Sequence, residues 1–300
     1  MIELQNVRKH FGSVKAVDGI SFAARPGNIF GLIGPNGAGK STTIRMIMNI
    51  LAPDSGNIYF SGETIGEKDK ERIGYLPEER GLYKKVKVND LLLYFCALKG
   101  KNRAWSQEKI DFWLKKFDLL AWKERKIEEL SKGMTQKIQF IAAVAHDPDL
   151  LFFDEPFSGI DPVSADIITE SIIDLGKEGK TILFSTHIME NAEKICSDIF
   201  LMNKGSEIVS GSLQDIKNTY GSRSIIVECD GDTEFLNRLP QVDNFIRYPR
   251  WLEIQLIEEA SQEEFLRLLA AKLRIRKYEI VSPTLHKIFV SLVKEEAGNE

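Results

Sequence analysis

Cysteine and histidine are scarce in this chain, and neither residue type is clustered. The 300 residues contain three cysteines, with no pair separated by two residues: Cys96, Cys196 and Cys229. An odd, scattered set argues against a disulfide framework and fits a reducing compartment. The four histidines have no spacing typical of metal ligands: His10, His146, His187 and His286. Composition therefore predicts neither a disulfide-stabilised domain nor a histidine-rich metal centre.

Long apolar runs and an excess of one charge are also missing. No uninterrupted apolar run reaches the roughly 18 residues that a membrane-spanning helix needs, and residues 1–7 lack the basic-then-apolar pattern of a secretory signal. If a membrane is involved, we expect a partner to provide the spanning segments. Lys and Arg number 40 against 44 Asp and Glu, for a net charge of −4. This balance gives no bulk attraction to nucleic acid.

A glycine-rich stretch at residues 34–42 is the strongest motif, because it fits the phosphate-loop pattern G-x-x-x-x-G-K-[ST]. Its residues are Gly34, Pro35, Asn36, Gly37, Ala38, Gly39, Lys40, Ser41 and Thr42. The glycines allow successive N–H groups to point at phosphate oxygens, Lys40 adds positive charge, and Ser41 offers a hydroxyl to Mg²⁺. An apolar strand at residues 29–33 and a helix at 41–51 flank the loop. The stretch therefore predicts a phosphate site at a helix N-terminus.

An acidic pair follows a second apolar strand, at residues 150–153. Asp154 and Glu155 stand at the end of that strand. In phosphate-loop ATPases, one such carboxylate orients metal-bound water and the next accepts the proton of the attacking water. We assign these roles to Asp154 and Glu155, against the alternative of an acidic turn after a core strand.

Five further residues, at four places in the chain, allow two interpretations each. Phe11, between two strands, fits either a base-stacking ring or a core residue of a hairpin. Glu78, after a strand at 73–76, fits either a metal or water ligand or a solvated turn. Ser131 and Gly133, before a helix at 135–145, fit either a second anion site or an ordinary helix cap. His187, after a strand at 181–185, fits either a phosphate donor or a structural histidine.

The pattern of apolar residues divides the chain into two parts. Residues 1–220 read as an α/β domain, with a helical insert at about 84–145 and a closing helix at 213–220. We expect Asn89 and Ser106 to cap two helices of the insert. Residues 221–300 read as strand-helix-strand-strand-helix-strand with a final helix, which predicts a small α+β domain of the split βαβ, ferredoxin-like type.

These motifs, in this order, resemble those of the ATP-binding subunit of ABC transporters over about residues 1–220. The matching stretches are 34–42 (Walker A), 130–134 (signature), 150–155 (Walker B with its catalytic Glu) and 158–161 (D-loop), with His187 as the switch histidine and Phe11 as the adenine-stacking aromatic. Two features depart from the family. Glu78 stands where Gln is usual, and the signature has Lys132 and Met134 in place of Gly and Gln. Residues 74–83 and the extra C-terminal domain resemble a bacterial exporter branch.

The resemblance implies a P-loop cassette with an antiparallel β subdomain and a helical insert. It implies ATP and Mg²⁺ as ligands, with Ser41, Asp154 and Glu78 at the metal and Glu155 and His187 in catalysis. Two cassettes, as a homodimer or heterodimer, would close head to tail, so that Ser131 and Gly133 contact the ATP of the partner. A separate integral-membrane permease would contact residues 78–83 and the helical insert at the cytoplasmic face of the membrane, and no nucleic acid would be bound.

Three other classes are less compatible with the sequence. A DNA-repair ATPase of this type carries a long coiled coil between the phosphate loop and the signature, and the roughly 90 residues here are too few for many heptads. A translation factor of this type usually carries two cassettes, whereas this chain has one phosphate loop. A module that uses ATP only to hold a dimer together would not need Glu155 and His187.

Overall fold

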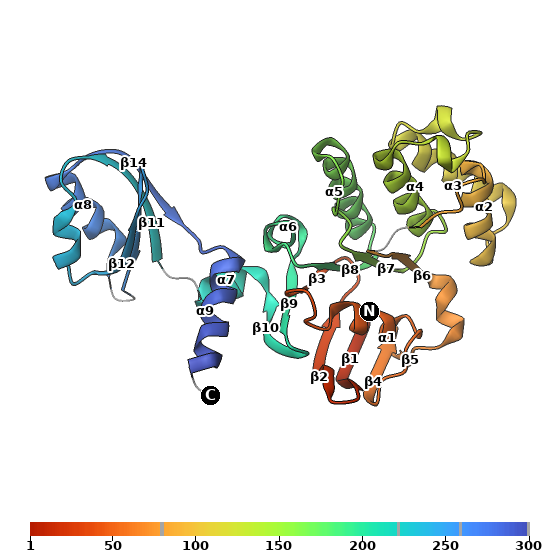
Figure 1. The fold of residues 1–300 in the computed structure, drawn as a ribbon, viewed down its shortest axis with the longest axis horizontal. Helices are drawn as coiled ribbons and strands as arrows, with labels where there is room; N and C mark the ends of the chain where they lie inside the picture. Colours follow the sequence, from red (N-terminus) through yellow and green to blue (C-terminus); the bar gives the residue numbers. More distant parts are fainter. Residues whose placement is uncertain (79–80, 221–222, 258–259, 299–300) are drawn as a thin grey trace. The chain divides into compact units, whose positions relative to one another are not determined.

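The computed structural model describes residues 1–78, 81–220, 223–257 and 260–298, and its chain separates into two compact units, Met1–Gly211 and Ser212–Glu300 (Figure 1). The helix that we expected to close the first domain, α7 (Leu213–Tyr220), belongs to the second unit. It contacts α9 (Leu285–Gly298), so its buried residues Leu213 and Ile216 have their partner in the C-terminal part of the chain. The first unit therefore ends after Gly211.

A six-stranded sheet forms the centre of the first unit. Its order is β10 (Ser206–Ser212), β9 (Asp198–Asn203), β3 (Ile29–Ile33), β8 (Thr181–Thr186), β7 (Leu150–Asp154) and β6 (Ile73–Leu76). The five strands from β9 to β6 pair in parallel. Strands β3, β7 and β8 are buried along their whole length, as expected for a parallel sheet covered on both faces. Because parallel strands end at the same edge, the segments that follow β3, β6, β7 and β8 are brought together there.

Helices pack around this sheet, and some of them form the helical insert. They are α1 (Lys40–Ile47), α2 (Val88–Leu98), α3 (Arg103–Lys116), α4 (Lys132–Val144), α5 (Pro162–Lys177) and α6 (Met189–Ile195). The insert helix α4 is fixed to the sheet by Phe140, whose ring stacks on Phe153 with centroids 5.3 Å apart. Since Phe153 precedes Asp154, this stack ties the helix of the signature to the acidic pair.

The predicted caps of the insert are wrong. Asn89 is buried inside the first turn of α2, where its side chain accepts a hydrogen bond from Gln107 Nε2 at 3.0 Å. Asn102, not Ser106, caps α3, because its extended backbone lets its side-chain oxygen accept from the N–H of Trp105 at 3.0 Å. Ser106 lies one turn into α3 and donates to the carbonyl of Asn102.

A second, antiparallel sheet completes the first unit, in the order β2 (Val14–Ala24), β1 (Ile2–Phe11), β4 (Ser55–Phe60) and β5 (Glu63–Thr64). Its core is continuous with that of the parallel sheet, and Phe22 stacks on Phe30 with centroids 4.9 Å apart. The polar segment that follows β4 contains β5 and a 3₁₀ helix at Glu67–Arg72.

The second unit contains a four-stranded antiparallel sheet, β12 (Val242–Arg247), β13 (Leu252–Leu256), β11 (Arg223–Asp230) and β14 (Arg274–Val281). This order is the one that the split βαβ pattern requires, with the 3₁₀ helix Glu234–Arg238 and α8 (Gln262–Lys272) as the two crossovers. The first crossover was predicted as an α-helix. Phe265 and Leu269 of α8 pack on Ile225 and Ile254 of the sheet, which gives this unit its own core.

Candidate functional site

The phosphate-loop segment depends on two glycines that no other residue replaces without strain. Gly34 and Gly39 have φ angles of +159° and +111°. A β-carbon on Gly34 would overlap the carbonyl oxygen of Met202, and one on Gly39 would overlap that of Ala16. Gly37, at φ +80°, has open space around it. The loop is thus held against β9 and β2 at its two ends, while its middle faces outward.

Lys40, the first residue of α1, turns its ammonium group back over the loop. Its Nζ donates to the carbonyl oxygens of Gly34, at 2.7 Å, and Pro35, at 3.0 Å. Burial lowers the pKa of Lys40, and the carboxylates of Glu155, Asp154 and Glu78 oppose this change. The loop therefore carries a buried positive charge at the end of β3, with acidic groups facing it.

Ser41 and Asp154 form a candidate cation site. The hydroxyl of Ser41 donates to Asp154 Oδ2 at 3.3 Å. The other oxygen, Oδ1, is buried and receives no hydrogen bond from any residue that the structure describes. Burial raises the pKa of Asp154, the nearby hydroxyl of Ser185 opposes this change, and the charges of Glu78 and Glu155 add to it. A hydroxyl beside a carboxylate with an unsatisfied oxygen is a donor set that suits Mg²⁺.

Glu155, which directly follows β7, is held by residues at the end of the neighbouring strand β8. Its backbone N–H donates to the carbonyl of Ser185, and its φ is +47°. Oε1 accepts from the N–H of His187 at 2.7 Å and lies 2.5 Å from Nδ1 of the same residue. Oε2 accepts from Thr186 Oγ1 at 3.0 Å. The structure therefore brings the two residues that we assigned to catalysis into direct contact.

Thr186 is a site residue that the sequence reasoning missed. It is 1% exposed, and its hydroxyl accepts from the N–H of Ile188 while donating to Glu155. A threonine at the end of an apolar strand is typical of strands, so its type gave no signal. Its position one residue before His187, at the edge where the acidic pair lies, could have indicated it.

Phe11 and Glu78, the two remaining candidates on the strands, lie at strand ends. Phe11 ends β1 and is 51% exposed, so it is not a core residue of the hairpin. Glu78 follows β6, where Leu76 pairs with Phe153, and its side chain is exposed. Its charge acts on both Lys40 and Asp154. The neighbouring Glu79 and Arg80, part of the segment expected to contact a permease, lie outside the described residues.

Ser131 and Gly133 stand at the start of α4 and are not joined to the phosphate loop by any described hydrogen bond. The Ser131 hydroxyl caps the helix by accepting from the N–H of Met134 at 3.2 Å. A β-carbon on Gly133 would lie 3.3 Å from Asp161 Oδ2. Asp161 caps α5, accepting from the N–H of Ser164 at 3.0 Å. The signature segment thus faces the D-loop of its own chain rather than its own Lys40.

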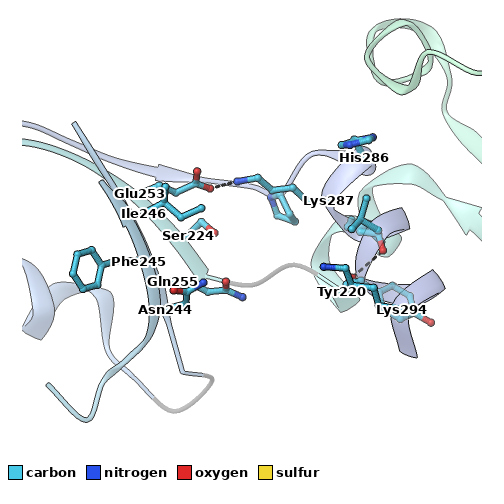
Figure 2. Close-up of a pocket in the computed structure, with 14 residues that line it drawn as sticks. Tyr220, Ser224, Asn244, Phe245, Ile246, Glu253, Gln255, His286, Lys287 and Lys294 are labelled. Atoms are coloured by element: carbon cyan, nitrogen blue, oxygen red, sulfur yellow. Dashed lines mark hydrogen bonds and ion pairs between the residues drawn. The ribbon is translucent and has the colours of Figure 1, made fainter. Parts of the chain in front are cut away.

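A separate cavity of about 640 Å³ lies in the second unit, between the sheet and α9 (Figure 2). Glu253 and Lys287 form an ion pair across it. Polar residues of β11 to β13 face it together with Ile246. None of the residues assigned to ATP or Mg²⁺ lines this cavity.

No helix within the described ranges is both long and apolar enough to cross a bilayer. The same ranges contain no cluster of three or more His, Cys, Asp or Glu side chains suited to a metal ion.

Known families match both units. The ABC transporter family matches residues 17–158, and the C-terminal domain of DrrA1-3-like ATP-binding proteins matches residues 211–293. The chain is 41% identical over 293 residues to an uncharacterized ABC transporter ATP-binding protein, YhaQ of Bacillus subtilis (strain 168), with 98% of each chain covered. It is 38% identical over 214 residues to the Nod factor export ATP-binding protein I of Paraburkholderia xenovorans (strain LB400), with 70% of each chain covered.

Solved structures share the fold of the first unit. One ATP-binding subunit of an ABC transporter superposes with a TM-score of 0.68 at 29% sequence identity, over 73% of this chain and 93% of that one.

Proposed function

Because this chain belongs to the family of ABC transporter ATP-binding proteins, it binds and hydrolyses ATP, and we propose that it powers export through a separate membrane permease. The observation that carries the proposal is the convergence of Lys40, Ser41, Asp154 and Glu155 on one edge of the parallel sheet. A phosphate-binding lysine, a cation site and a general base in contact with a histidine are the parts that ATP hydrolysis requires.

The loop 34–42 holds the phosphates of ATP. Its N–H groups and the dipole of α1 attract the negative charge, and Lys40 exchanges its two carbonyl acceptors for phosphate oxygens. The exposed ring of Phe11 offers the adenine base a flat surface. These groups orient the nucleotide so that its terminal phosphate lies toward Asp154 and Glu155.

Ser41 and Asp154 hold Mg²⁺, with Glu78 as a further oxygen ligand or as a ligand of bound water. When bound, Mg²⁺ neutralises charge that develops on the phosphate oxygens. Of the two carboxylates assigned to Mg²⁺, that of Asp154 is buried and that of Glu78 is exposed. The unsatisfied Oδ1 of Asp154 is therefore the atom that gains most from a cation.

Glu155 takes the proton of the attacking water, and His187 acts with it. Both oxygens of Glu155 are engaged in the arrangement described above, so one must be released before it accepts a proton. The His187 side chain is 43% exposed, so breaking its contact with Glu155 would let it turn toward a terminal phosphate. This movement would couple the presence of ATP to the release of the base.

The second wall of each ATP site comes from another cassette, in a homodimer or a heterodimer. Ser131 and Gly133 lie at the N-terminus of α4, where N–H groups favour an anion, and their contacts within the chain do not reach the loop. ATP bound between two chains then brings the cassettes together, and hydrolysis separates them.

The permease binds this subunit at the cytoplasmic face of the membrane, through the segment after Glu78 and the helical insert. The direction of transport is inferred from the relatives, since the Nod factor protein named above is an export protein. Nucleic acid is not a partner, in keeping with the net charge of −4.

A complementation experiment tests the shared site. Lys40→Ala removes the phosphate contact of a chain's own loop, and Ser131→Arg blocks the wall that it offers to the partner. Each variant alone should be inactive, because both ATP sites of every dimer then carry the substitution. Mixed in equal amounts, they form dimers in which one site has an intact loop and an intact signature, so ATPase activity should return to a substantial fraction.

No recovery on mixing would contradict the shared site, provided that both variants form mixed dimers in a pull-down with two tags. ATPase activity per chain that stays constant on dilution would contradict it as well. Cosedimentation with permease-containing membranes, abolished in membranes without the permease, tests the partner independently.

A further inference from the structure

The helical insert has a charge that the rest of the chain does not share. Between Lys84 and Lys126 there are twelve Lys and Arg residues against five Asp and Glu, although acidic residues exceed basic ones in the whole chain. Several of these cations are neutralised locally, as in the pairs Lys116–Asp174 and Lys123–Asp111. The excess positive charge of the insert therefore comes from the lysine and arginine side chains that form no ion pair.

The unpaired cations gather around the outer face of α3. Its inner face is buried against the insert through Ile110, Trp113 and Leu114. Away from that face, Trp105, Lys109 and Phe112 follow one another at spacings of four and three residues and form a single stripe, with the exposed carboxylate of Glu108 beside it. We call this stripe, with Lys101 before it and Lys115 beside it, the α3 outer face.

Aromatic rings and ammonium groups alternate on the α3 outer face. The Nζ atoms of Lys101 and Lys109 lie 5.1 and 5.7 Å from the centre of the Trp105 ring. Phe112 is 58% exposed. No carboxylate of the described chain lies within ion-pair distance of Lys101, Lys109 or Lys115. The face thus combines a half-buried and an exposed ring with three lysines and one carboxylate, which leaves it with a net positive charge.

We propose that the α3 outer face binds the surface of an anionic phospholipid bilayer. Tryptophan and phenylalanine favour the headgroup region, where a ring sits among apolar and polar groups, and lysines attract anionic headgroups. The long lysine side chains let the ammonium groups reach the lipid phosphates while their stems lie along the rings. The proposal concerns this chain alone and does not require the permease.

A bilayer fits this face better than an acidic protein does. A stable protein partner needs roughly 800 Å² of surface from each side and a complementary shape. One stripe of a single helix offers too little area for such a partner. A fluid lipid surface requires no complementary shape, only opposite charge and room for the rings.

Cosedimentation of the full-length chain with vesicles tests the proposal. Phosphatidylcholine vesicles with about 30% phosphatidylglycerol should bind it, pure phosphatidylcholine vesicles should not, and added salt should weaken binding. A basic residue near an anionic leaflet contributes about 1 kcal/mol, or about a fivefold change in partitioning. Lys109→Gln with Lys115→Gln should therefore reduce binding about 25-fold.

The matched control is Lys177→Gln with Lys194→Gln, which removes the same charge from exposed positions of the same unit outside the insert. It should bind as the unchanged chain does. Phe112→Gln keeps every charge and should still weaken binding about fivefold, because the ring no longer enters the headgroup region. Unchanged ATPase activity and circular dichroism show that each variant is folded.

Three results would overturn the proposal: equal binding to both vesicle types, equal losses in the α3 pair and its control, or no effect of Phe112→Gln. If vesicles are not bound but Lys109→Gln with Lys115→Gln weakens capture by the permease, the face contacts protein and the assignment to lipid is wrong.

Discussion

The side chain of His187 contacts Glu155 directly, with its Nδ1 atom 2.5 Å from Oε1. Thr186, which ends β8 and directly precedes His187, donates to the other oxygen of Glu155. The position of the carboxylate is therefore set by the end of β8 rather than by the loop that carries Glu155. Any change at the end of β8 should affect the hydrolysis step.

Thr186→Val should lower kcat about 10- to 100-fold with little change in KM for ATP. The variant keeps the shape of the side chain but loses the hydrogen bond that orients Glu155, and misplacing a catalytic group by about 1 Å has this order of effect. Steady-state ATPase assays give both constants. Thr186→Ser, which restores the hydroxyl, should recover most of kcat, and equal activity of the Val and Ser variants would rule out the positioning role.

Glu155→Gln should slow hydrolysis by about 10²- to 10⁴-fold, the usual contribution of a general base. The amide oxygen still accepts hydrogen bonds from the N–H of His187 or from Thr186, so the fold should be kept. Single-turnover assays measure the rate, and size exclusion with ATP should show a dimer that the unchanged chain forms only transiently. A variant that keeps more than about a tenth of the rate would exclude Glu155 as the base.

Gly39→Ala should abolish tight ATP binding and lower the free energy of unfolding by about 3 kcal/mol. Its β-carbon would overlap the carbonyl oxygen of Ala16 at a φ of +111°. Gly37→Ala is the control, because nothing lies near its β-carbon and only the backbone strain of about 1 kcal/mol remains. Isothermal titration with ATP and chemical denaturation measure both effects, and similar results for the two variants would contradict the steric account.

Acid should destabilise the protein through His146. Burial lowers the pKa of His146 to about 4, and the charge of Lys99 acts in the same direction. The unfolded chain, with a pKa near 6.5, takes up a proton that the folded chain does not. The stabilisation is complete above pH 6.5 and is lost as the pH falls toward 4, by up to about 3 kcal/mol.

Denaturant unfolding at several pH values measures this dependence. His146→Asn should have a lower free energy of unfolding at neutral pH, since the Nε2 contact with the carbonyl of Ile73 is lost. The free energy of unfolding of this variant should fall by about 3 kcal/mol less between pH 6.5 and 4 than that of the unchanged chain. The same slope in both proteins would show that another group causes the acid sensitivity.

The sequence indicated, for a physical reason, which segments meet at one edge of the parallel sheet. Apolar strands that end in polar residues are easily recognised, and in a parallel sheet their ends must meet at one edge. The phosphate loop, the acidic pair and His187 are all of this kind. The family and the P-loop fold inferred from them are confirmed by the relatives and by the solved cassette.

What the sequence did not predict depends on contacts with distant residues. Helix α7 has an apolar side, but its partner α9 begins about 70 residues later, so its place in the second unit has no local signal. Asn89 and Asn102 are both good capping residues. Only the packing of α2 on α3 decides that the first is buried and the second caps.

Thr186 shows the same limit within the site. Its hydroxyl matters because Glu155 lies beside it, which is a property of the pairing between β7 and β8. Residue type alone could not separate it from the other threonines of the chain. Sequence patterns indicated which strand ends meet, whereas contacts that depend on the neighbouring strand were not expected.

The position of β3 in the sheet has a consequence for biosynthesis. The strand that feeds the phosphate loop pairs on both sides with β8 and β9, which are translated about 150 residues later. At 5–20 residues per second, the apolar segment Ile29–Ile33 waits roughly 10–30 s on the ribosome without its neighbours. Nascent chains shorter than about 200 residues should therefore need chaperones, and acquisition of nucleotide affinity should mark the moment at which synthesis of the cassette is complete.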